Sequence, residues 1–251
     1  EKPLGTAHAV YCAKSSLQDK VIVAFSDTLF KADFKLNTES DGILWTKKVE
    51  DPSSFGVVKK DGNGYVDGFY EKPQEYVSDE AIIGVYYFRR GEELKQEIEY
   101  LLNNKLMVNG EYQLTDALEN LRSKGNLFTT SVVTQWYDCG NKISTVTTNR
   151  EILKYYSRNE LIHGTSEVDN SVVIDPCYIG EGVRLKNSVV GPYVSVENNT
   201  CIKNSLISNS IIQSDTHLER VNIVNSMIGN NINMEGKPSD LSVGDYTNIK
   251  L

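Results

Sequence analysis

The chain has 251 residues, of which 39% are hydrophobic and 24% charged, a composition that supports a buried core and excludes global disorder. The 26 Lys and Arg against 34 Asp and Glu give a net charge of −8, so the sequence lacks the basic surface that nucleic acid or an anionic membrane would require. No apolar run approaches the roughly 20 residues that span a bilayer, and the opening residues do not have the form of a signal peptide. The four cysteines show no CxxC spacing, and we expect reduced thiols in a cytoplasmic protein.

The first part of the chain, to residue 163, alternates patterns typical of helices and of strands. The apolar run at Lys20–Phe25 predicts a strand buried on both faces, and the DGNG sequence at Asp61–Gly64 predicts a hairpin turn. This alternation predicts an α/β domain over residues 1–163, with a mostly parallel sheet and a linker helix at its end. The predicted segments are a helix at 6–17, strands at 20–25, 42–47, 55–59 and 81–88, helices at 92–102 and 113–124, a strand at 127–133 and a helix at 142–161.

Residues 164–251 follow a different pattern, in which helix signals vanish and apolar residues recur every five or six positions. Every third apolar residue belongs to one series: Ile174, Val190, Ile207 and Ile223; Ile179, Val196, Ile212 and Ile228; or Leu185, Ile202, Leu218 and Met234. Three short faces per turn, each with one inward side chain, predict a parallel β-helix of about four coils. The pattern resembles the left-handed β-helix of hexapeptide-repeat proteins. A β-sandwich is the alternative, but its period-2 alternation fits this spacing poorly.

Asn residues recur in this second part within the pattern Asn-Ser followed by two apolar residues. Asn tolerates the left-handed backbone that tight corners need. We therefore expect these residues at the corners of the coils, with side chains that hydrogen-bond from one coil to the next. They are Asn170, Asn187, Asn204, Asn209 and Asn225.

Four short motifs in the first part carry residue types suited to phosphate and metal chemistry. The LGTA turn at Leu4–Ala7 precedes a helix N-terminus, whose free amides suit an anion or a flat base. Asp27 follows a buried strand, where open α/β sheets bind ligands, and is a candidate Mg²⁺ ligand. The EKP motif at Glu71–Pro73 offers an ammonium group for a phosphate, and the WYDCG motif at Trp136–Gly140 offers a second carboxylate. Taken singly, each motif is also compatible with an ordinary cap, turn or surface charge.

Seven ordered segments include these motifs: LGTAHAV (Leu4–Val10), SDTLF (Ser26–Phe30), FGVV (Phe55–Val58), FYEKP (Phe69–Pro73), IIGVYYF (Ile82–Phe88), EYQLTDAL (Glu111–Leu118) and WYDCG (Trp136–Gly140). In order and spacing they resemble one family, the sugar-1-phosphate nucleotidylyltransferases, also called nucleotide-sugar pyrophosphorylases. The resemblance covers nearly all of residues 3–153, and the trailing β-helix is a feature of many members. It implies a Rossmann-like nucleotidyltransferase sheet, truncated here at its N-terminus, and an enzyme of the nucleotidyltransferase class.

The resemblance implies that an oxygen of a sugar-1-phosphate attacks the α-phosphate of a nucleoside triphosphate, which gives a nucleotide sugar and pyrophosphate. Such transfers depend mostly on positioning and charge neutralisation. The resemblance also implies a Mg²⁺ cofactor, whose charge explains how an acidic protein binds an anionic substrate. The residues implied are Gly5 and Thr6 at the nucleobase and ribose, Glu71, Gly84 and Glu111 at the sugar, and a catalytic set of Lys72 at the sugar phosphate with Asp27 and Asp138 as Mg²⁺ ligands.

Three features depart from the family pattern. The family's glycine-rich phosphate loop, with its Arg and Lys, is absent from a sequence that opens immediately before LGTA, so we expect part of the catalytic domain to be missing. Ser26 stands where the family usually has Gly before the metal-binding Asp. Ile82 stands where the family often has an Asn that hydrogen-bonds the sugar.

These departures keep a second hypothesis open, that of a catalytically silent homologue that acts as a regulatory or scaffold subunit of an assembly. Ile82 and the absent loop favour it, whereas the retained Asp27, Asp138 and Lys72 argue against it.

A third hypothesis makes the β-helix an acyltransferase that uses a His as base. His163 lies in the linker, and His217 is expected to point outward because it precedes the inward Leu218. We expect the β-helix instead to mediate homo-oligomerisation, with its flat faces covered by a partner subunit.

Overall fold

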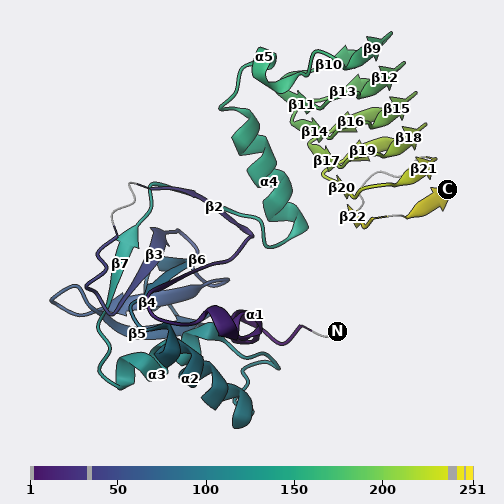
Figure 1. Cartoon of the computed structure of the whole chain (residues 1–251). Coiled ribbons are helices and arrows are strands. Elements are labelled where there is room, and N and C mark those ends of the chain that lie inside the picture. Colours follow the sequence, from purple (N-terminus) through teal and green to yellow (C-terminus); the bar gives the residue numbers. More distant parts are fainter. Residues whose placement is uncertain (1–2, 33–35, 237–241, 246, 251) are drawn as a thin grey trace. The chain divides into compact units, whose positions relative to one another are not determined.

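The computed structural model describes residues 3–32, 36–236, 242–245 and 247–250, and the chain forms two compact units, Glu1–Tyr137 and Asp138–Leu251 (Figure 1). The boundary precedes helix α4 (Lys142–Leu153), which the sequence analysis grouped with the first domain. This helix packs against strands of the second unit, and for that reason it separates with them. Among the described residues, no helix has the length and apolar character needed to cross a membrane.

The described helices and strands of the first unit follow the predicted order closely. They are α1 (Thr6–Cys12), the 3₁₀ turn η1 (Lys14–Ser16), β1 (Val21–Ala24), β2 (Thr28–Lys31), β3 (Gly42–Lys48), β4 (Gly56–Lys60), β5 (Val66–Glu71), β6 (Glu80–Phe88), α2 (Gly91–Asn103), α3 (Leu114–Ser123), β7 (Phe128–Val132) and β8 (Gln135–Asp138). The list of predicted strands lacks β5, which is the second strand of the predicted hairpin, and also β2 and β8, which are short and pair with each other.

The main sheet has the order β5-β4-β6-β3-β7, and β1 also pairs with β6. The α/β class is confirmed, but the sheet is mixed rather than mostly parallel. Among the described strands of this sheet, only β3 and β7 run parallel, while the other pairs are antiparallel. The reason is the connections: β3 to β6 follow one another through turns and loops, which suit antiparallel pairing, whereas β7 reaches its parallel place beside β3 only after β4 to β6, α2 and α3.

Strand β6 changes its partner on one edge at Gly84. Before this residue Ala81 pairs with Val57 of β4, and after it Val85 pairs with Ala24 of β1. Gly84 has a φ of 81°, in the left-handed region that glycine adopts readily. A single glycine therefore places the end of β1 beside the middle of β6.

The two sides of the sheet bury different clusters. Alternate residues of β6, Ile82, Tyr86 and Phe88, join the core beneath α1, α2 and α3, while Ile83, Val85 and Tyr87 pack with Trp45 on the other side. The helix predicted over 92–102 is confirmed as α2, and its residues Leu94, Ile98 and Leu101 are buried in the first of these cores.

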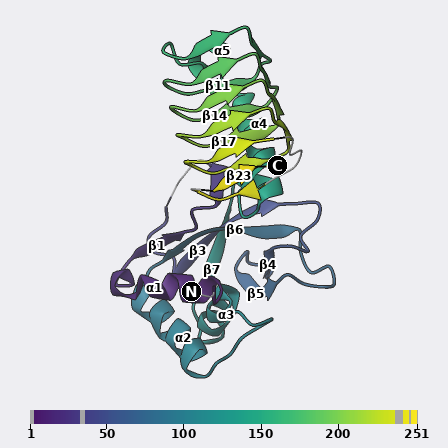
Figure 2. The same cartoon turned by 90° about the vertical axis from the view of Figure 1, so that its right-hand side faces the viewer.

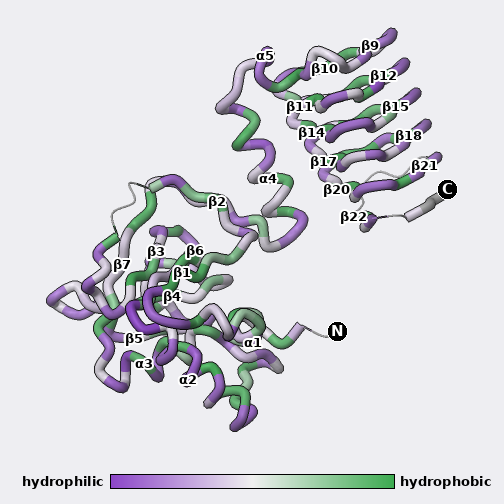
Figure 3. Tube along the Cα trace, in the orientation of Figure 1, coloured by the Kyte–Doolittle hydropathy of each residue, from purple (hydrophilic) through white to green (hydrophobic). Residues whose placement is uncertain are grey.

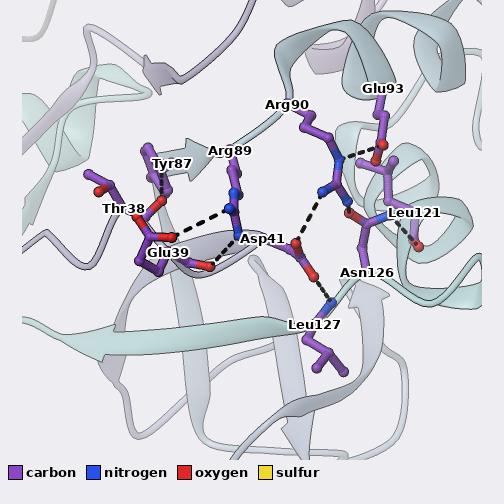
Figure 4. A network of polar contacts seen from close by, with 10 residues as sticks. All are labelled: Thr38, Glu39, Asp41, Tyr87, Arg89, Arg90, Glu93, Leu121, Asn126 and Leu127. Atoms are coloured by element: carbon purple, nitrogen blue, oxygen red, sulfur yellow. Dashed lines mark hydrogen bonds and ion pairs between the residues drawn. The ribbon is translucent and has the colours of Figure 1, made fainter.

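A polar network fixes the junction between β6, α2 and the start of β7 (Figure 4). Asp41 accepts a hydrogen bond from the backbone N–H of Leu127 at 3.1 Å and forms an ion pair with Arg90 at 3.5 Å. Arg90 also donates to Asn126, and Arg89 donates to the carbonyl of Glu39 at 3.0 Å. The exposed charges here orient chain segments around the helix start, and the network is structural.

The second unit begins with two helices instead of the single helix predicted over residues 142–161. A new helix starts after Ser157, because Ser157 and Glu160 form a capping box. The elements are α4, α5 (Arg158–Leu161), β9 (Glu167–Asp169), β10 (Val172–Val173), β11 (Cys177–Ile179), β12 (Arg184–Lys186), β13 (Val189–Val190), β14 (Val194–Val196), β15 (Cys201–Lys203), β16 (Leu206–Ser208), β17 (Ser210–Ile212), β18 (His217–Glu219), β19 (Asn222–Val224), β20 (Met227–Ile228), β21 (Asn233–Glu235), β22 (Ser242–Val243) and β23 (Asn248–Lys250).

These strands stack into a parallel β-helix of about four coils, which confirms the prediction (Figure 2). Hydrophobic and hydrophilic stretches alternate around the coils (Figure 3). The backbone pairing reproduces the two series that begin at Ile179 and Leu185, and every member of both is buried. The third series is confirmed from Val190 onward.

Ile174 was assigned wrongly as the first inward residue of this third series. Val173 pairs with Val190, so this coil has 17 residues, and Ile174 is 42% exposed. Two adjacent apolar residues satisfy the spacing equally well, and only the backbone pairing decides between them.

The Asn residues stand at the predicted corners. All five named above have φ between 42° and 53°. Their side chains connect neighbouring coils: Asn170 Nδ2 donates to Asn187 Oδ1 at 2.8 Å, and Asn187 Nδ2 donates to Asn204 Oδ1 at 3.2 Å. The ladder thus stabilises the corner conformation and the stacking together.

We expect Asn187→Ala to lower the free energy of unfolding by about 2 kcal/mol, because it loses two side-chain hydrogen bonds and places alanine in the left-handed region. Urea unfolding followed by circular dichroism measures the change. Asn187→Gly is the control, since it loses only the hydrogen bonds and should cost less. An alanine variant as stable as the wild type would contradict the role of the ladder.

Candidate functional site

The glycine turn before α1 is held by the segment before α3. Tyr112 N donates to Leu4 O at 2.8 Å, and Ala7 N donates back to Tyr112 O at 3.0 Å. Leu114 N donates to Thr6 Oγ1 at 2.9 Å. Gly5 has a φ of 97°, and a Cβ there would lie 2.6 Å from Tyr112 O and 2.9 Å from the Glu111 Cβ. The predicted site residues Gly5, Thr6 and Glu111 are therefore brought together, although about 100 residues separate them in sequence.

Glu71, the last residue of β5, lies against the first turn of α3. Its Oε2 accepts a hydrogen bond from Thr115 Oγ1 at 3.1 Å. Burial raises the pKa of Glu71; the Thr115 hydrogen bond and the Lys72 charge oppose this, and the charges of Asp116 and Glu111 add to it. Three carboxylates and one ammonium group thus act on one another in this part of the site.

Gly56 provides the space in which Glu71 and its neighbours meet. A Cβ at Gly56 would lie 3.1 Å from Glu71 Oε2, 3.2 Å from a methyl carbon of Thr115 and 3.6 Å from the Ile82 Cδ1. Ile82, which replaces the family's Asn, is therefore an apolar neighbour of the Glu71 carboxylate, and it is buried in the core beneath the helices.

Asp27 lies at the end of β1, beside the point where β6 changes partner. Phe25 N donates to Gly84 O at 2.9 Å, and Thr28 Oγ1 donates to Ile83 O at 2.7 Å. These two bonds place the predicted site residues Asp27 and Gly84 at the same position of the sheet. The Asp27 side chain is exposed.

Tyr86 links the surroundings of Asp27 and Glu71. It is buried, and burial together with the charges of Glu71 and Asp27 raises the pKa of its hydroxyl far above the usual range. The charges of both carboxylates therefore act on the same buried hydroxyl, and we group them as one acidic region.

Lys72 is exposed directly after β5, and its backbone has a φ of 44°. Lys72 N donates to Phe55 O at 3.1 Å, which fixes the turn. A bulky residue held in the left-handed region is unusual, and such strain occurs often at binding sites.

Asp138 ends β8 and is the first residue of the second unit. Its Oδ1 accepts a hydrogen bond from Gly140 N at 3.0 Å, and its carbonyl accepts one from Thr148 Oγ1 of α4 at 2.9 Å. These bonds fix the turn that leads to the start of α4, where Asn141 caps the helix.

Within the described part of the chain, no group of three or more His, Cys, Asp and Glu side chains has the arrangement of a metal site. Asp27 and Asp138 nevertheless have the chemistry of Mg²⁺ ligands, since carboxylate oxygens are the donors that Mg²⁺ prefers, with phosphate oxygens and water completing its shell. The Gly140 hydrogen bond occupies one Asp138 oxygen and leaves the other for a cation.

The sequence analysis did not single out three residues of the site: Thr115, Asp116 and Tyr86. All three lie inside quoted motifs, but nothing in their spacing indicates that they contact or influence Glu71. The pairing of α3 with the end of β5 decides this, and that pairing is a tertiary contact.

The two His residues considered for acyl transfer make ordinary surface contacts. His163 is exposed and shares a hydrogen bond with Thr165 Oγ1 at 2.9 Å. His217 points outward, as predicted, and its Nε2 lies 3.6 Å from a carboxylate oxygen of Glu219.

Comparison with known proteins agrees with this arrangement. Residues 1–155 match the family model described as Nucleotidyl transferase. The chain is 32% identical to the glucose-1-phosphate thymidylyltransferase of Streptomyces antibioticus over 259 residues, covering 92% of this chain and 70% of that protein. It is 28% identical to the glucose-1-phosphate thymidylyltransferase of Streptomyces griseus over 279 residues, covering 100% of this chain and 77% of that protein. It is also 28% identical to the bifunctional protein GlmU of Methanococcus vannielii over 262 residues, covering 93% of this chain and 61% of that protein.

The glycine turn, the acidic region and the matched family define a nucleotidyltransferase domain followed by a β-helix. The chain belongs to the nucleotidyl transferase family, and within it to the enzymes of the sugar-1-phosphate type.

The pKa of Glu71 gives a stability test. Because the folded-state pKa is raised above the ordinary value of 4.5, the unfolded chain ionises first, and stability falls as the pH rises from 4.5 through the folded-state pKa. We expect Glu71→Gln to be more stable than the wild type at pH 7 and no more stable below pH 4.5, because the amide keeps the shape without the buried charge. Thermal unfolding across this pH range measures the difference, and a gain that is independent of pH would contradict the assignment.

Proposed function

We propose that the protein transfers a nucleotidyl group from a nucleoside triphosphate to a sugar-1-phosphate and releases pyrophosphate, in a reaction that depends on Mg²⁺. The observation that supports this most strongly is the convergence of Gly5, Thr6, Glu111, Glu71 and Asp27 in one unit, from four separate segments of the chain. The names of the most similar Streptomyces enzymes suggest thymidine triphosphate and glucose-1-phosphate as the first substrates to test.

The proposed roles follow from the chemistry of each group. We assign the nucleobase and ribose to the turn at Gly5 and Thr6, whose shape is fixed by the close packing of Gly5 against the Tyr112 backbone. The carboxylates of Glu71 and Glu111 accept hydrogen bonds from sugar hydroxyls, and Gly84 leaves room for the sugar. Lys72 neutralises the sugar phosphate, as an exposed ammonium group on a fixed turn can do.

We propose Asp27 and Asp138 as the protein ligands of Mg²⁺. When bound, the ion supplies charge stabilisation for the phosphate oxygens. The carboxylates of this region would repel a free triphosphate, so the protein's own contribution is to select the metal complex and to orient the sugar phosphate toward it.

We also propose an oligomeric state and a cellular location for the protein. We infer a homo-oligomer assembled through the β-helix, and a protein of the cytoplasm, where nucleoside triphosphates are supplied. The four cysteines are free thiols, in keeping with a reducing compartment.

The test is Mg²⁺-dependent release of pyrophosphate by the full protein, with a panel of triphosphates and sugar-1-phosphates. We expect Asp27→Asn and Asp138→Asn each to lower kcat/KM by about 100-fold or more, since charge stabilisation by a metal contributes several kcal/mol. Asp67→Asn is the matched control, because this exposed carboxylate lies 3.9 Å from Arg122 and outside the proposed site.

Unchanged rates in both site variants would remove the metal role. No release with any substrate pair would favour the alternative of a silent regulatory or scaffold subunit, for which the apolar Ile82 beside Glu71 is the supporting observation.

A further inference from the structure

The three outer faces of the β-helix differ in chemistry, and the first is highly charged. It includes β9, β12, β15, β18 and β21, in each of which the inward residue is flanked by two outward ones. Of these ten outward residues, seven carry a charge at neutral pH, so water covers this face readily. The ten are Glu167, Asp169, Arg184, Lys186, Cys201, Lys203, His217, Glu219, Asn233 and Glu235.

The second face, formed by β11, β14, β17 and β20, is covered by the chain itself. Helix α4 packs against β14 and β17. Ser195 in the middle of the face is only 8% exposed, and its hydroxyl donates to Asn149 Oδ1 of α4 at 2.6 Å. This face is therefore already covered by α4 of the same chain.

The third face contains β10, β13, β16 and β19, and its outward rows carry no charged side chain among the residues that the structure describes; we call it the neutral face. Its first outward row runs in register through Val172, Val189, Leu206 and Asn222. The row that follows the inward residues is Ile174, Gly191, Ser208 and Val224. None of these eight residues is charged, and Val172, Leu206 and Ile174 are 56%, 47% and 42% exposed.

The surface of the neutral face is uneven, with a ridge and a groove. Val172, Val189 and Leu206 form a ridge along successive coils, and a shallow groove of about 650 Å³ runs beside it. The groove is lined by the ridge residues Val189 and Leu206 and by Asn187, Asn204, Ser205, Arg220, Val221 and Asn222. A ridge beside a groove is a shape that complements itself after a two-fold rotation.

We propose that the neutral face binds the neutral face of a second copy of this chain, with the two-fold axis near Val189. The chain carries a net charge of −8, so two copies repel each other, and a contact between faces whose outward rows are uncharged adds no like-charge pairs to that repulsion. Neighbouring parallel strands are about 4.8 Å apart in both copies, so ridge and groove match in period and each ridge can lie in the groove of the other copy. Apolar area on a sheet face is the kind of surface that such contacts cover.

This inference specifies the homo-oligomer named under the proposed function, and it does not depend on the catalytic assignment. Its test measures association alone, so its failure and the failure of the nucleotidyl-transfer proposal are distinguishable.

Sedimentation equilibrium of the full protein at micromolar concentration is the test. We expect a dimeric wild type, and about a tenfold or larger rise in the dissociation constant for Val189→Asp and for Leu206→Asp, because each buries an unpaired charge. Asn233→Asp is the control: it adds the same charge on the charged face and should associate as the wild type does. Circular dichroism verifies that each variant is folded.

Mixing Val189→Asp with Val189→Lys tests the symmetry, since each variant alone repels itself while the mixture pairs opposite charges across the axis. Restored association in the mixture supports the two-fold contact. The proposal is overturned by a monomeric wild type, by face variants that associate as tightly as Asn233→Asp, or by a mixture that stays dissociated.

Discussion

The candidate site depends on the half-buried carboxylate of Glu71 and on the hydrogen bond that it accepts from Thr115. Burial disfavours its ionised form, and the hydrogen bond from Thr115 offsets only part of that cost. The first turn of α3 must therefore stay against the end of β5, and α3 is held in turn by the pairing of residues 111–114 with the glycine turn before α1. Through this chain of contacts, one polar group couples the proposed base-binding turn to the proposed sugar pocket.

Much of the fold could be read from the sequence because strong periodic signals decide it. The β-helix repeats one constraint on every coil, so both complete apolar series agree with the backbone pairing, and the corner Asn residues follow from their left-handed conformation. Ile174 shows the limit of such reasoning: Val173 and Ile174 are both apolar, and a coil of 16 or 17 residues fits either. The direction of a strand in the first unit leaves no periodic pattern in the sequence. For this reason a mostly parallel sheet was predicted, whereas β4 pairs antiparallel with both β5 and β6.

The candidate site was predictable as motifs but not as a set of contacts. Gly5 and Gly84 stand out in sequence only as glycines, and their importance follows from what surrounds them: Tyr112 at one, Phe25 and Thr28 at the other. Thr115 and Tyr86 modify the carboxylates without belonging to any signature for phosphate or metal chemistry. The proposed metal ligands Asp27 and Asp138 are a different case, because they belong to different units. Their assignment to one metal ion is a proposal that rests on chemistry and family resemblance.

The distribution of charge bears on both the nucleotidyl-transfer proposal and the self-association proposal. An acidic region that handles phosphates requires a cation from outside the chain, and an acidic protein that self-associates requires a surface free of charge. The sequence alone shows the net charge of −8 but not where the charges lie, because outward and inward residues are assigned only by the register of the coils. Once the register is known, charges crowd one face, α4 occupies another, and the described outward rows of the third carry no charge. A neutral face on so acidic a chain reduces the repulsion that a second copy would otherwise meet, and this makes self-association the occupant that the electrostatics favour.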